Sequence, residues 1–169
     1  LAETLFGDEK FLLRLDMSEF AAADALERLI GAAQSGQPGL LANLLRTHSY
    51  GVLLLDEFEK TNRQAQNLFL QVFDEGFFSD MRGRRVNARN MLFIATTNAA
   101  ADLIWQLVKS GQSLAAARSQ IIDYLVTQNL FRPELLNRFD DIIFYQPLSA
   151  EELSQVARRL LGRLAARLE

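Results

Sequence analysis

Two short apolar runs constrain the fold of this chain more than any other feature of its sequence. Residues 52–55, VLLL, and 91–95, MLFIA, contain no polar side chain and no alternation of apolar and polar residues. A strand with one face in water alternates, whereas a strand covered on both faces does not, and the second pattern is typical of parallel sheets. The runs therefore predict an α/β fold with a mainly parallel sheet.

Helical patterns separate these runs from two further candidate strands, as expected for an α/β domain. The further candidate strands are residues 11–15 and 142–145. The clearest helix begins at Thr61, because Thr61 and Gln64 match a capping box, and it ends at Gly76. Shorter helices are predicted over residues 22–30, 40–46, 101–109 and 114–127.

The segment 74–90, DEGFFSDMRGRRVNARN, interrupts this alternation of strands and helices with two glycines and several arginines. We expect it to form a hairpin or loop that projects from the sheet, where functional segments are often inserted. Its arginines form a local basic cluster, which consists of Arg82, Arg84, Arg85 and Arg89.

An amphipathic helix is predicted after Pro147. Ser149 and Glu152 form a second capping box, and the helix that follows has one apolar face and one face with arginines. Because such a helix needs a surface to pack on, we expect an α/β domain over residues 1–147 and the first helix of a small domain over 148–169. The apolar stripe is Leu153, Val156, Leu160, Leu161, Leu164 and Leu168, and the arginines are Arg158, Arg159, Arg163 and Arg167.

The overall composition limits the classes of function. The 169 residues are 49% hydrophobic, which is enough for the core of one domain, and a formal charge of −3 gives no global positive field for nucleic acid or an anionic membrane. The absence of cysteine excludes a disulfide framework and a thiolate nucleophile, and a single histidine, His48, excludes a multi-histidine metal site. No apolar stretch is long enough to span a membrane.

Two adjacent carboxylates, Asp56 and Glu57, follow the first apolar run. In open α/β sheets, ligands bind beyond the carboxyl ends of the strands, which is where this pair falls. One acid there could hold Mg²⁺, directly or through water, while its neighbour polarises an attacking water, as in nucleotide-hydrolysing folds. An acid that caps the next helix would produce the same pattern. The pair alone leaves both interpretations open.

A second motif, IATTN at residues 94–98, ends the other apolar run with three polar side chains. Polar groups at neighbouring strand ends converge on one crevice, where the amide of Asn98 could orient a water toward a γ-phosphate. An asparagine in a simple turn would account for the motif equally well.

A third motif, FRPELLNRFDD at residues 131–141, places Arg132 and Arg138 on either side of a short helical turn that begins with proline. An arginine fork matches the charge and shape of a phosphate. Either arginine could instead be a surface residue that pairs with Asp140 or Asp141.

In this order, the motifs together resemble those of the Clp/ClpB-type AAA+ protein unfoldases, specifically their second nucleotide-binding domain. The resemblance extends over nearly the whole chain. The segments that carry it are LDMSEF (15–20) after the family's second strand, LLLDEFEK (53–60) as Walker B, DEGFFSDMRGRRV (74–86) as its D-G-x-x-x-D-x-x-G-R-x-V stretch, IATTN as sensor 1, and FRPELLNRFD (131–140) as the arginine-finger motif.

The resemblance implies an AAA+ P-loop NTPase-like sheet flanked by helices, followed by the start of a helical small domain. It implies that Asp56 organises Mg²⁺ through water and that Glu57 activates the attacking water. Asn98 would act as sensor 1 and contact the nucleotide. Arg138 would reach the ATP of a neighbouring subunit as an arginine finger. The implied cofactors are thus ATP and Mg²⁺, and activity would require a homo-oligomeric ring, hexameric in the family.

The function implied by the resemblance is that of a fragment of an ATP-dependent Clp-type chaperone, which couples ATP hydrolysis to protein unfolding or disaggregation. Its partners would be protein substrates and, in one branch of the family, a peptidase, in the cytoplasm or an organelle matrix. The sequence contains no GxxxxGK[ST] loop, and LAETLF (1–6) resembles the end of the helix that follows that loop. We therefore expect the phosphate cradle to precede Leu1 and the isolated chain to bind ATP poorly and lack activity.

One segment departs from the family's pattern. Where the family has a glycine-flanked aromatic loop that grips substrate, this chain has GAAQSGQPG at residues 31–39, without an aromatic residue and with little apolar area. This departure keeps a second interpretation open, a non-hydrolysing AAA+ module that serves assembly only. A third, an AAA+ protein that acts on nucleic acid, has the arginine cluster in its favour and the acidic balance against it.

Overall fold

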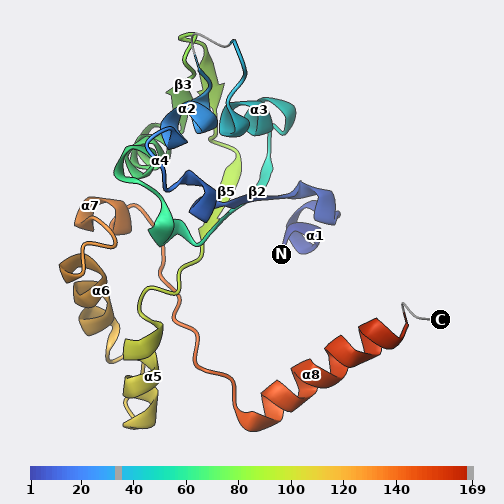
Figure 1. The fold of residues 1–169 in the computed structure, drawn as a ribbon, viewed down its shortest axis with the longest axis vertical. Helices are drawn as coiled ribbons and strands as arrows, with labels where there is room; N and C mark the ends of the chain where they lie inside the picture. Colours follow the sequence, from blue (N-terminus) through green and yellow to red (C-terminus); the bar gives the residue numbers. More distant parts are fainter. Residues whose placement is uncertain (33–35, 167–169) are drawn as a thin grey trace. The chain divides into compact units, whose positions relative to one another are not determined.

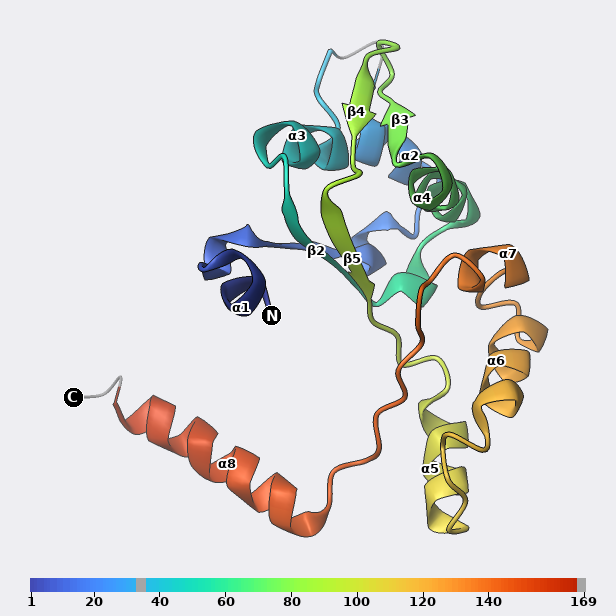
Figure 2. The same ribbon diagram turned by 180° about the vertical axis from the view of Figure 1, so that it is seen from behind.

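The computed structural model describes residues 1–32 and 36–166 and separates into two compact units. The first unit contains Leu1–Ala99 and Tyr124–Asp141, and the second contains Ala100–Asp123 and Ile142–Glu169. Figures 1 and 2 show the elements of each unit along the chain. The sheets and the candidate site belong to the first unit, so each unit is described by itself.

The first unit is built on a parallel sheet of three strands in the order β1-β2-β5. The strands are β1 (Leu12–Asp16), β2 (Gly51–Asp56) and β5 (Met91–Ala95), which confirms the predicted parallel sheet and three of its strands. In the register, Asp16 lies opposite Asp56. All three strands therefore end at the same edge of the sheet (Figure 2).

The central strand is buried as its composition predicts, but β5 is not. Val52, Leu53 and Leu55 of β2 are fully buried. In β5, Leu92 is 41% exposed, so the prediction that this strand is covered on both faces is wrong. The reason is that β5 lies at an edge of the sheet that the described residues form, and no described strand pairs with its outer side.

Helices and short 3₁₀ turns surround the sheet, close to the predicted positions. The predicted helix at 40–46 is confirmed, and the one at 22–30 begins three residues later than expected. The helices of the first unit are α1 (Ala2–Phe6), α2 (Ala25–Ile30), α3 (Leu40–Thr47), α4 (Arg63–Glu75) and α7 (Pro133–Leu136), and the 3₁₀ turns are Glu9–Phe11, Met17–Phe20 and Phe58–Lys60.

The longest of these helices, α4, has a different N-cap from the predicted one. The side chain of Asn62 accepts a hydrogen bond from the Ala65 N–H at 2.9 Å. Thr61 instead closes the preceding 3₁₀ turn, and its buried hydroxyl has no hydrogen-bond partner in the described chain. The predicted capping box of Thr61 and Gln64 is therefore wrong by one residue. The predicted end is confirmed, because Gly76 adopts the left-handed conformation with φ 71°.

The predicted hairpin is also confirmed. β3 (Phe77–Ser79) and β4 (Arg85–Asn87) pair in antiparallel fashion within the 74–90 segment. Phe78 and Val86 lie opposite each other in the register and are both buried. The hairpin therefore has an apolar side that is anchored in the first unit.

The second unit is helical and contains no described strand. It holds α5 (Ala101–Lys109), as predicted, and the first half of α6 (Arg118–Thr127), which begins four residues later than expected. The predicted strand at 142–145 is wrong: the segment is extended but pairs with none of the described strands, and Ile143 and Tyr145 are 69% and 82% exposed. An extended segment without a ladder partner does not form a strand.

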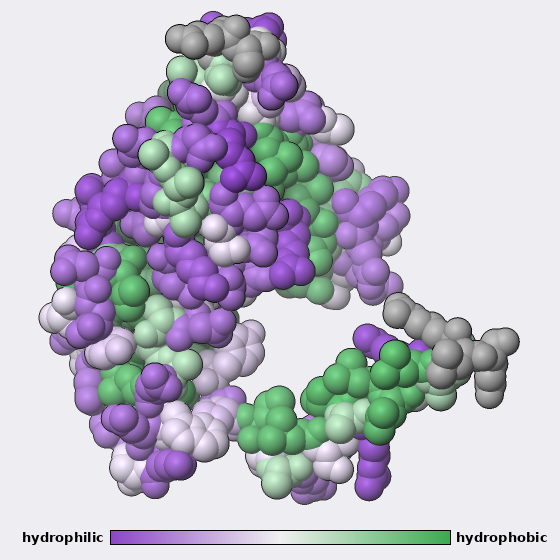
Figure 3. Space-filling view, in the orientation of Figure 1, coloured by the Kyte–Doolittle hydropathy of each residue, from purple (hydrophilic) through white to green (hydrophobic). Residues whose placement is uncertain are grey.

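The second unit also holds α8 (Ala150–Ala165), which begins with the predicted capping box of Ser149 and Glu152. Its apolar stripe is exposed over the described residues, and Figure 3 shows it as a row of hydrophobic side chains. Leu168 and Arg167 of the predicted faces lie outside the described residues. Across residues 1–32 and 36–166, no helix combines the length and the apolar character needed to cross a membrane.

Candidate active site at the strand ends

The carboxyl ends of β2 and β5 meet in a small network of polar groups. Beyond the last ladder pair, the Thr96 N–H donates to the Leu55 carbonyl at 2.9 Å, and the Phe58 N–H donates to the Thr96 carbonyl at 2.9 Å. These bonds carry the pairing one residue past each strand. They bring the two motifs that the sequence singled out, the acid pair and IATTN, into direct contact.

Asp56 uses both oxygens of its carboxylate within this network. Thr96 Oγ1 donates a hydrogen bond to Oδ1, and the Arg14 guanidinium of β1 forms an ion pair with Oδ2. The Thr96 hydrogen bond, and next the bond from Arg14, hold the pKa of Asp56 below its ordinary value. Asp56 is therefore an ionised carboxylate that is one-quarter exposed at the strand ends.

Glu57 occupies a backbone conformation that few residues adopt. Its φ of 55° and ψ of 47° lie in the left-handed region, which costs a non-glycine residue about 1 kcal/mol or more. The Glu57 N–H donates to Thr96 Oγ1 at 3.3 Å, and the side-chain Oε2 accepts from Lys60 Nζ at 2.6 Å. The hydrogen bond to Glu57 raises the pKa of the Lys60 ammonium. The two acids thus have different partners, Thr96 and Arg14 for Asp56 and Lys60 for Glu57.

Asn98 lies at the same edge with an exposed side chain. Its backbone N–H donates to Glu59 Oε1 at 3.4 Å, and its side-chain amide makes no hydrogen bond to any residue that the structure describes. The second carboxylate oxygen of Glu59, Oε2, is buried and also lacks a partner among these residues. The backbone at Asn98 is therefore tied to the turn after Glu57, while the amide is available to a ligand.

Arg138 is not part of this network. It forms an ion pair through Nε with Asp74, at the C-terminal end of α4, a partner that the sequence did not suggest. The nearby Arg132 donates from Nη1 to Asn67 Oδ1 at 3.1 Å. α4 has 13 residues and a length of about 20 Å, so Arg138 contacts the end of α4 remote from Glu57.

The residues at the strand ends fit a magnesium ion held largely by other ligands. In the part of the chain that the structure describes, no three acidic, histidine or cysteine side chains gather to hold a metal ion alone. Mg²⁺ commonly takes one or two protein carboxylates and completes its shell with waters and substrate phosphates. Asp56 supplies one ionised carboxylate. Its Oδ2 is engaged by Arg14, so that oxygen would hold a cation only through a water or after Arg14 moves.

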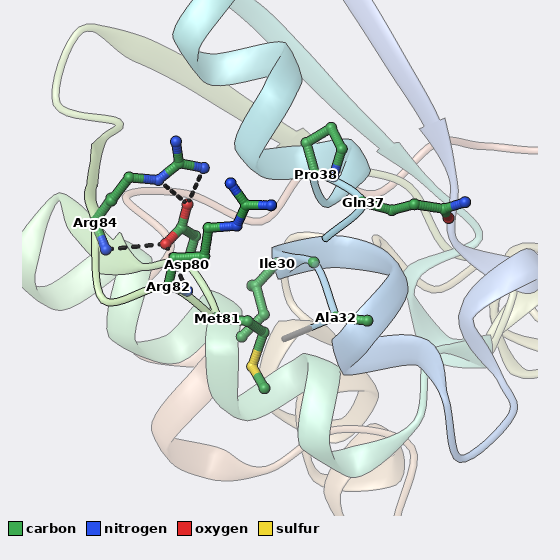
Figure 4. Close-up of a pocket in the computed structure, with 9 residues that line it drawn as sticks. Ile30, Ala32, Gln37, Pro38, Asp80, Met81, Arg82 and Arg84 are labelled. Atoms are coloured by element: carbon green, nitrogen blue, oxygen red, sulfur yellow. Dashed lines mark hydrogen bonds and ion pairs between the residues drawn. The ribbon is translucent and has the colours of Figure 1, made fainter. Parts of the chain in front are cut away.

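The segment 31–39 and the β3–β4 hairpin lie against each other on another side of the unit (Figure 4). Residues 33–35 of the aromatic-free loop lie outside the described residues, but Gly31 and Pro38 form a β-bridge. Arg82 Nη2 donates to the Gly36 carbonyl at 2.7 Å, so the hairpin contacts the loop directly. The cavity between them is about 10 Å³, which is room for about one water and no larger ligand.

Asp80 organises the turn of the hairpin. Its carboxylate accepts hydrogen bonds from Arg46 Nη2 at 2.6 Å, from Arg84 Nε at 2.9 Å, and from the N–H groups of Arg82 and Arg84 at 2.9 Å (Figure 4 draws the Arg82 and Arg84 contacts). Burial raises the pKa of Asp80, but the hydrogen bonds from Arg46 and Arg84 outweigh it and hold the pKa far below its ordinary value. Asp80 is therefore a buried anion that is fully compensated.

The predicted basic cluster is engaged by the chain itself. Besides Arg82 and Arg84, Arg85 stacks 3.5 Å from the centre of the Phe77 ring, and Arg89 donates to the Glu75 carbonyl at 3.5 Å. Each arginine of the cluster therefore has a contact within the chain, in or beside the hairpin.

A parallel sheet with acids at its strand ends is typical of nucleotide-binding α/β proteins, and comparison with known proteins agrees with this class. The model of the AAA domain (Cdc48 subfamily) matches residues 1–142, and the chain belongs to this family.

Curated relatives match almost the entire chain. The chaperone protein ClpB of Staphylococcus epidermidis is 37% identical over 173 residues, and that of Staphylococcus aureus is 36% identical over the same length; each match covers 99% of this chain and 20% of the relative. The ATP-dependent Clp protease ATP-binding subunit ClpC of Staphylococcus saprophyticus is 37% identical over 179 residues, which is 99% of this chain and 22% of that protein. The chain thus spans about a fifth of the length of these relatives.

Proposed function

We propose that this chain is part of an ATP-dependent Clp-type AAA+ unfoldase that couples ATP hydrolysis to the unfolding or disaggregation of proteins. The observation that carries the proposal is the junction of Asp56, Glu57 and Thr96 at the ends of adjacent parallel strands, in a chain of the AAA domain family. Such strand ends are where nucleotides bind in open α/β sheets. The relatives named as Clp chaperones and Clp protease subunits support the same class.

The proposed roles follow from the charge and position of each side chain. Asp56 holds Mg²⁺, through water while Arg14 engages its Oδ2, and the ion supplies charge neutralisation for the phosphates. Glu57 accepts a proton from the attacking water, for which Lys60 must release Oε2 or Oε1 must serve. Asn98 contacts the nucleotide with its free amide. Arg138 is held at the C-terminal end of α4, remote from the strand ends of its own subunit. It therefore acts on ATP held by a neighbouring copy.

The wider context is proposed on the resemblance to the relatives. Because Arg138 is proposed to act on the ATP of a neighbouring subunit, the active protein would be a ring of identical subunits, hexameric as in the family. The name of the ClpC relative supports a peptidase partner and that of ClpB a chaperone role, and protein substrates suit both. We place the protein in the cytoplasm or an organelle matrix. We also propose that residues 1–147 form the large subdomain and 148–169 the first helix of the small one.

The test of the proposal is Glu57→Gln in the full-length protein. The substitution keeps the size of the side chain and removes the charge that accepts the proton. We expect the Kd for ATP to stay within about twofold while kcat for hydrolysis falls by roughly 10²–10⁴-fold. Glu9→Gln, which changes an exposed glutamate remote from the strand ends, is the control and should leave both quantities unchanged. Unchanged turnover in Glu57→Gln contradicts the assigned role.

A non-hydrolysing assembly module is the second candidate, and one observation favours it. Both strand-end acids are already paired within the chain, Asp56 with Arg14 and Glu57 with Lys60, so the charges are satisfied without a nucleotide. The same experiment separates the candidates. If the unaltered full-length protein binds ATP but turns it over no faster than Glu57→Gln, the assembly role is the correct one.

A further inference from the structure

The ion pair between Arg138 and Asp74 leaves the Arg138 side chain half-exposed. The contact joins Nε of Arg138 to the carboxylate oxygen Oδ1 of Asp74. The Arg138 side chain is 51% exposed and that of Asp74 is 34% exposed. An arginine binds phosphate through the donors of its fork. The pair therefore restrains the guanidinium at Nε while about half of the side chain remains exposed.

The backbone on either side of Arg138 is fixed against the first unit. Before Arg138, the side chain of Arg132 donates to Asn67 of α4 at 3.1 Å. After it, the ring of Phe139 packs on Phe73 of α4 with centroids 5.3 Å apart. The Arg138 N–H also donates to the Leu135 carbonyl at 3.1 Å, which closes the turn after α7. The rotamer of Arg138 is the main freedom that remains, and Asp74 restricts it.

A row of aromatic rings connects this anchor to the strand ends. Phe58, the residue after Glu57, packs on Phe69 at 5.3 Å, and Phe69 packs on Phe73 at 6.1 Å. Phe58 and Phe69 are fully buried. Close-packed rings of this kind move little relative to one another. The row therefore fixes the position of the Arg138 segment relative to the acid pair of the same subunit, along α4.

We propose that Asp74 is a positioning residue for Arg138, which holds the guanidinium through Nε and presents its terminal donors to a phosphate bound by a neighbouring copy. The inference rests on the proposed role of Arg138 in trans. A long, flexible side chain loses much conformational freedom when it binds, and a side chain that is already restrained loses less. Asp74 lowers the barrier in this way and touches neither the nucleotide nor the water.

The test is a set of variants in the full-length protein. Asp74→Asn keeps the size of the side chain and removes its charge, so kcat for ATP hydrolysis should fall by roughly tenfold, as expected for a misplaced reacting group, with the Kd for ATP unchanged. Asp74→Ser should have the same effect, and Asp74→Glu should restore most of the rate. The control is Glu75→Gln, the next acid on α4, whose Oε2 faces Gln71 at 3.3 Å and not Arg138.

A double-variant comparison separates positioning from a purely structural role. In an Arg138→Ala background, Asp74→Asn should cause no further loss of kcat, because there is no guanidinium left to hold. A further loss of kcat in that background overturns the inference. A normal rate in both Asp74→Asn and Asp74→Ser, while Arg138→Ala is inactive, also overturns it. In both cases the role of Arg138 as a finger survives. A normal rate in Arg138→Ala removes the finger role and the inference together.

Discussion

Single charged side chains fix several parts of this structure, and Asp80 does so most completely. Two arginine side chains and two backbone N–H groups converge on one buried carboxylate, which joins α3 to the turn of the β3–β4 hairpin. A buried carboxylate is tolerated only when its charge and its lone pairs are compensated in this way. The turn next to the 31–39 loop therefore depends on a single ionised group.

Asp80→Asn should lower the thermal midpoint of unfolding, with a pH dependence set by the lowered pKa of Asp80. A carboxyl whose pKa is lower in the folded state stabilises fully above its unfolded pKa of about 4, and this stabilisation is lost as the pH falls toward the folded pKa. The difference in midpoint between the two proteins should thus be constant from pH 7 to about pH 5 and shrink below pH 4.

Circular dichroism melts between pH 7 and pH 2.5 measure this difference. The control is Asp123→Asn, which alters an exposed aspartate and should leave the midpoint unchanged at each pH. A difference between the wild type and Asp80→Asn that persists undiminished at pH 2.5 contradicts the account.

At the residue scale, the sequence predicts the acids but not their partners. Asp56, Glu57 and Asn98 follow apolar runs, so their place at the sheet edge could be inferred from the pattern. Arg14 and Asp74 could not be assigned, because their partners lie 42 and 64 positions away and no periodicity connects them. The available signal was Arg14, an arginine inside an otherwise apolar strand, but its side chain is 62% exposed, so the signal does not require a partner.

Among the elements, the connection between α2 and α3 is the one most constrained by a glycine. A Cβ added to Gly39 would overlap backbone atoms of Gly31 and Ile30, which cannot move as a flexible side chain can. The same approach brings Gly31 and Pro38 into their β-bridge. The base of the aromatic-free loop is therefore fixed by two backbones in direct contact.

Gly39→Ala should destabilise the first unit strongly, because one of the two backbones must separate. The control is Gly162→Ala in α8, where an added Cβ meets no atom and alanine favours a helix by about 0.5–1 kcal/mol. In thermal melts, the midpoint of unfolding should therefore fall in Gly39→Ala and should rise or stay unchanged in Gly162→Ala. A Gly39→Ala protein as stable as the wild type contradicts the close approach seen in the structure.

The errors at the element scale have physical causes. Residues 142–145 have the composition of a strand, but a strand forms only where another strand supplies hydrogen bonds, and composition does not reveal the partner. Burial of β5 was overestimated for the same reason, since an edge strand can be as apolar as a central one. The cap of α4 shifted by one residue, from Thr61 to Asn62, because both are good caps and the preceding turn uses Thr61.

For the whole molecule, the separation of two functional groups along α4 has the largest consequence. The acid pair lies before the N-terminus of α4, and Arg138 is held at its C-terminus by Asp74. One copy therefore offers an acid site and an arginine that do not meet within the same described unit. We therefore expect two copies to complete a site between them, as in the proposed ring.

The most direct measurement of this central claim mixes two inactive variants of the full-length protein. Arg138→Ala subunits retain Glu57, and Glu57→Gln subunits retain Arg138, so a mixed ring contains junctions where both groups are intact. We predict that each variant alone hydrolyses ATP at background rate and that mixtures recover activity, with a maximum at intermediate ratios. If no mixing ratio restores hydrolysis although the subunits co-assemble, Arg138 does not act on a neighbouring copy, and the proposed arrangement of the active site is contradicted.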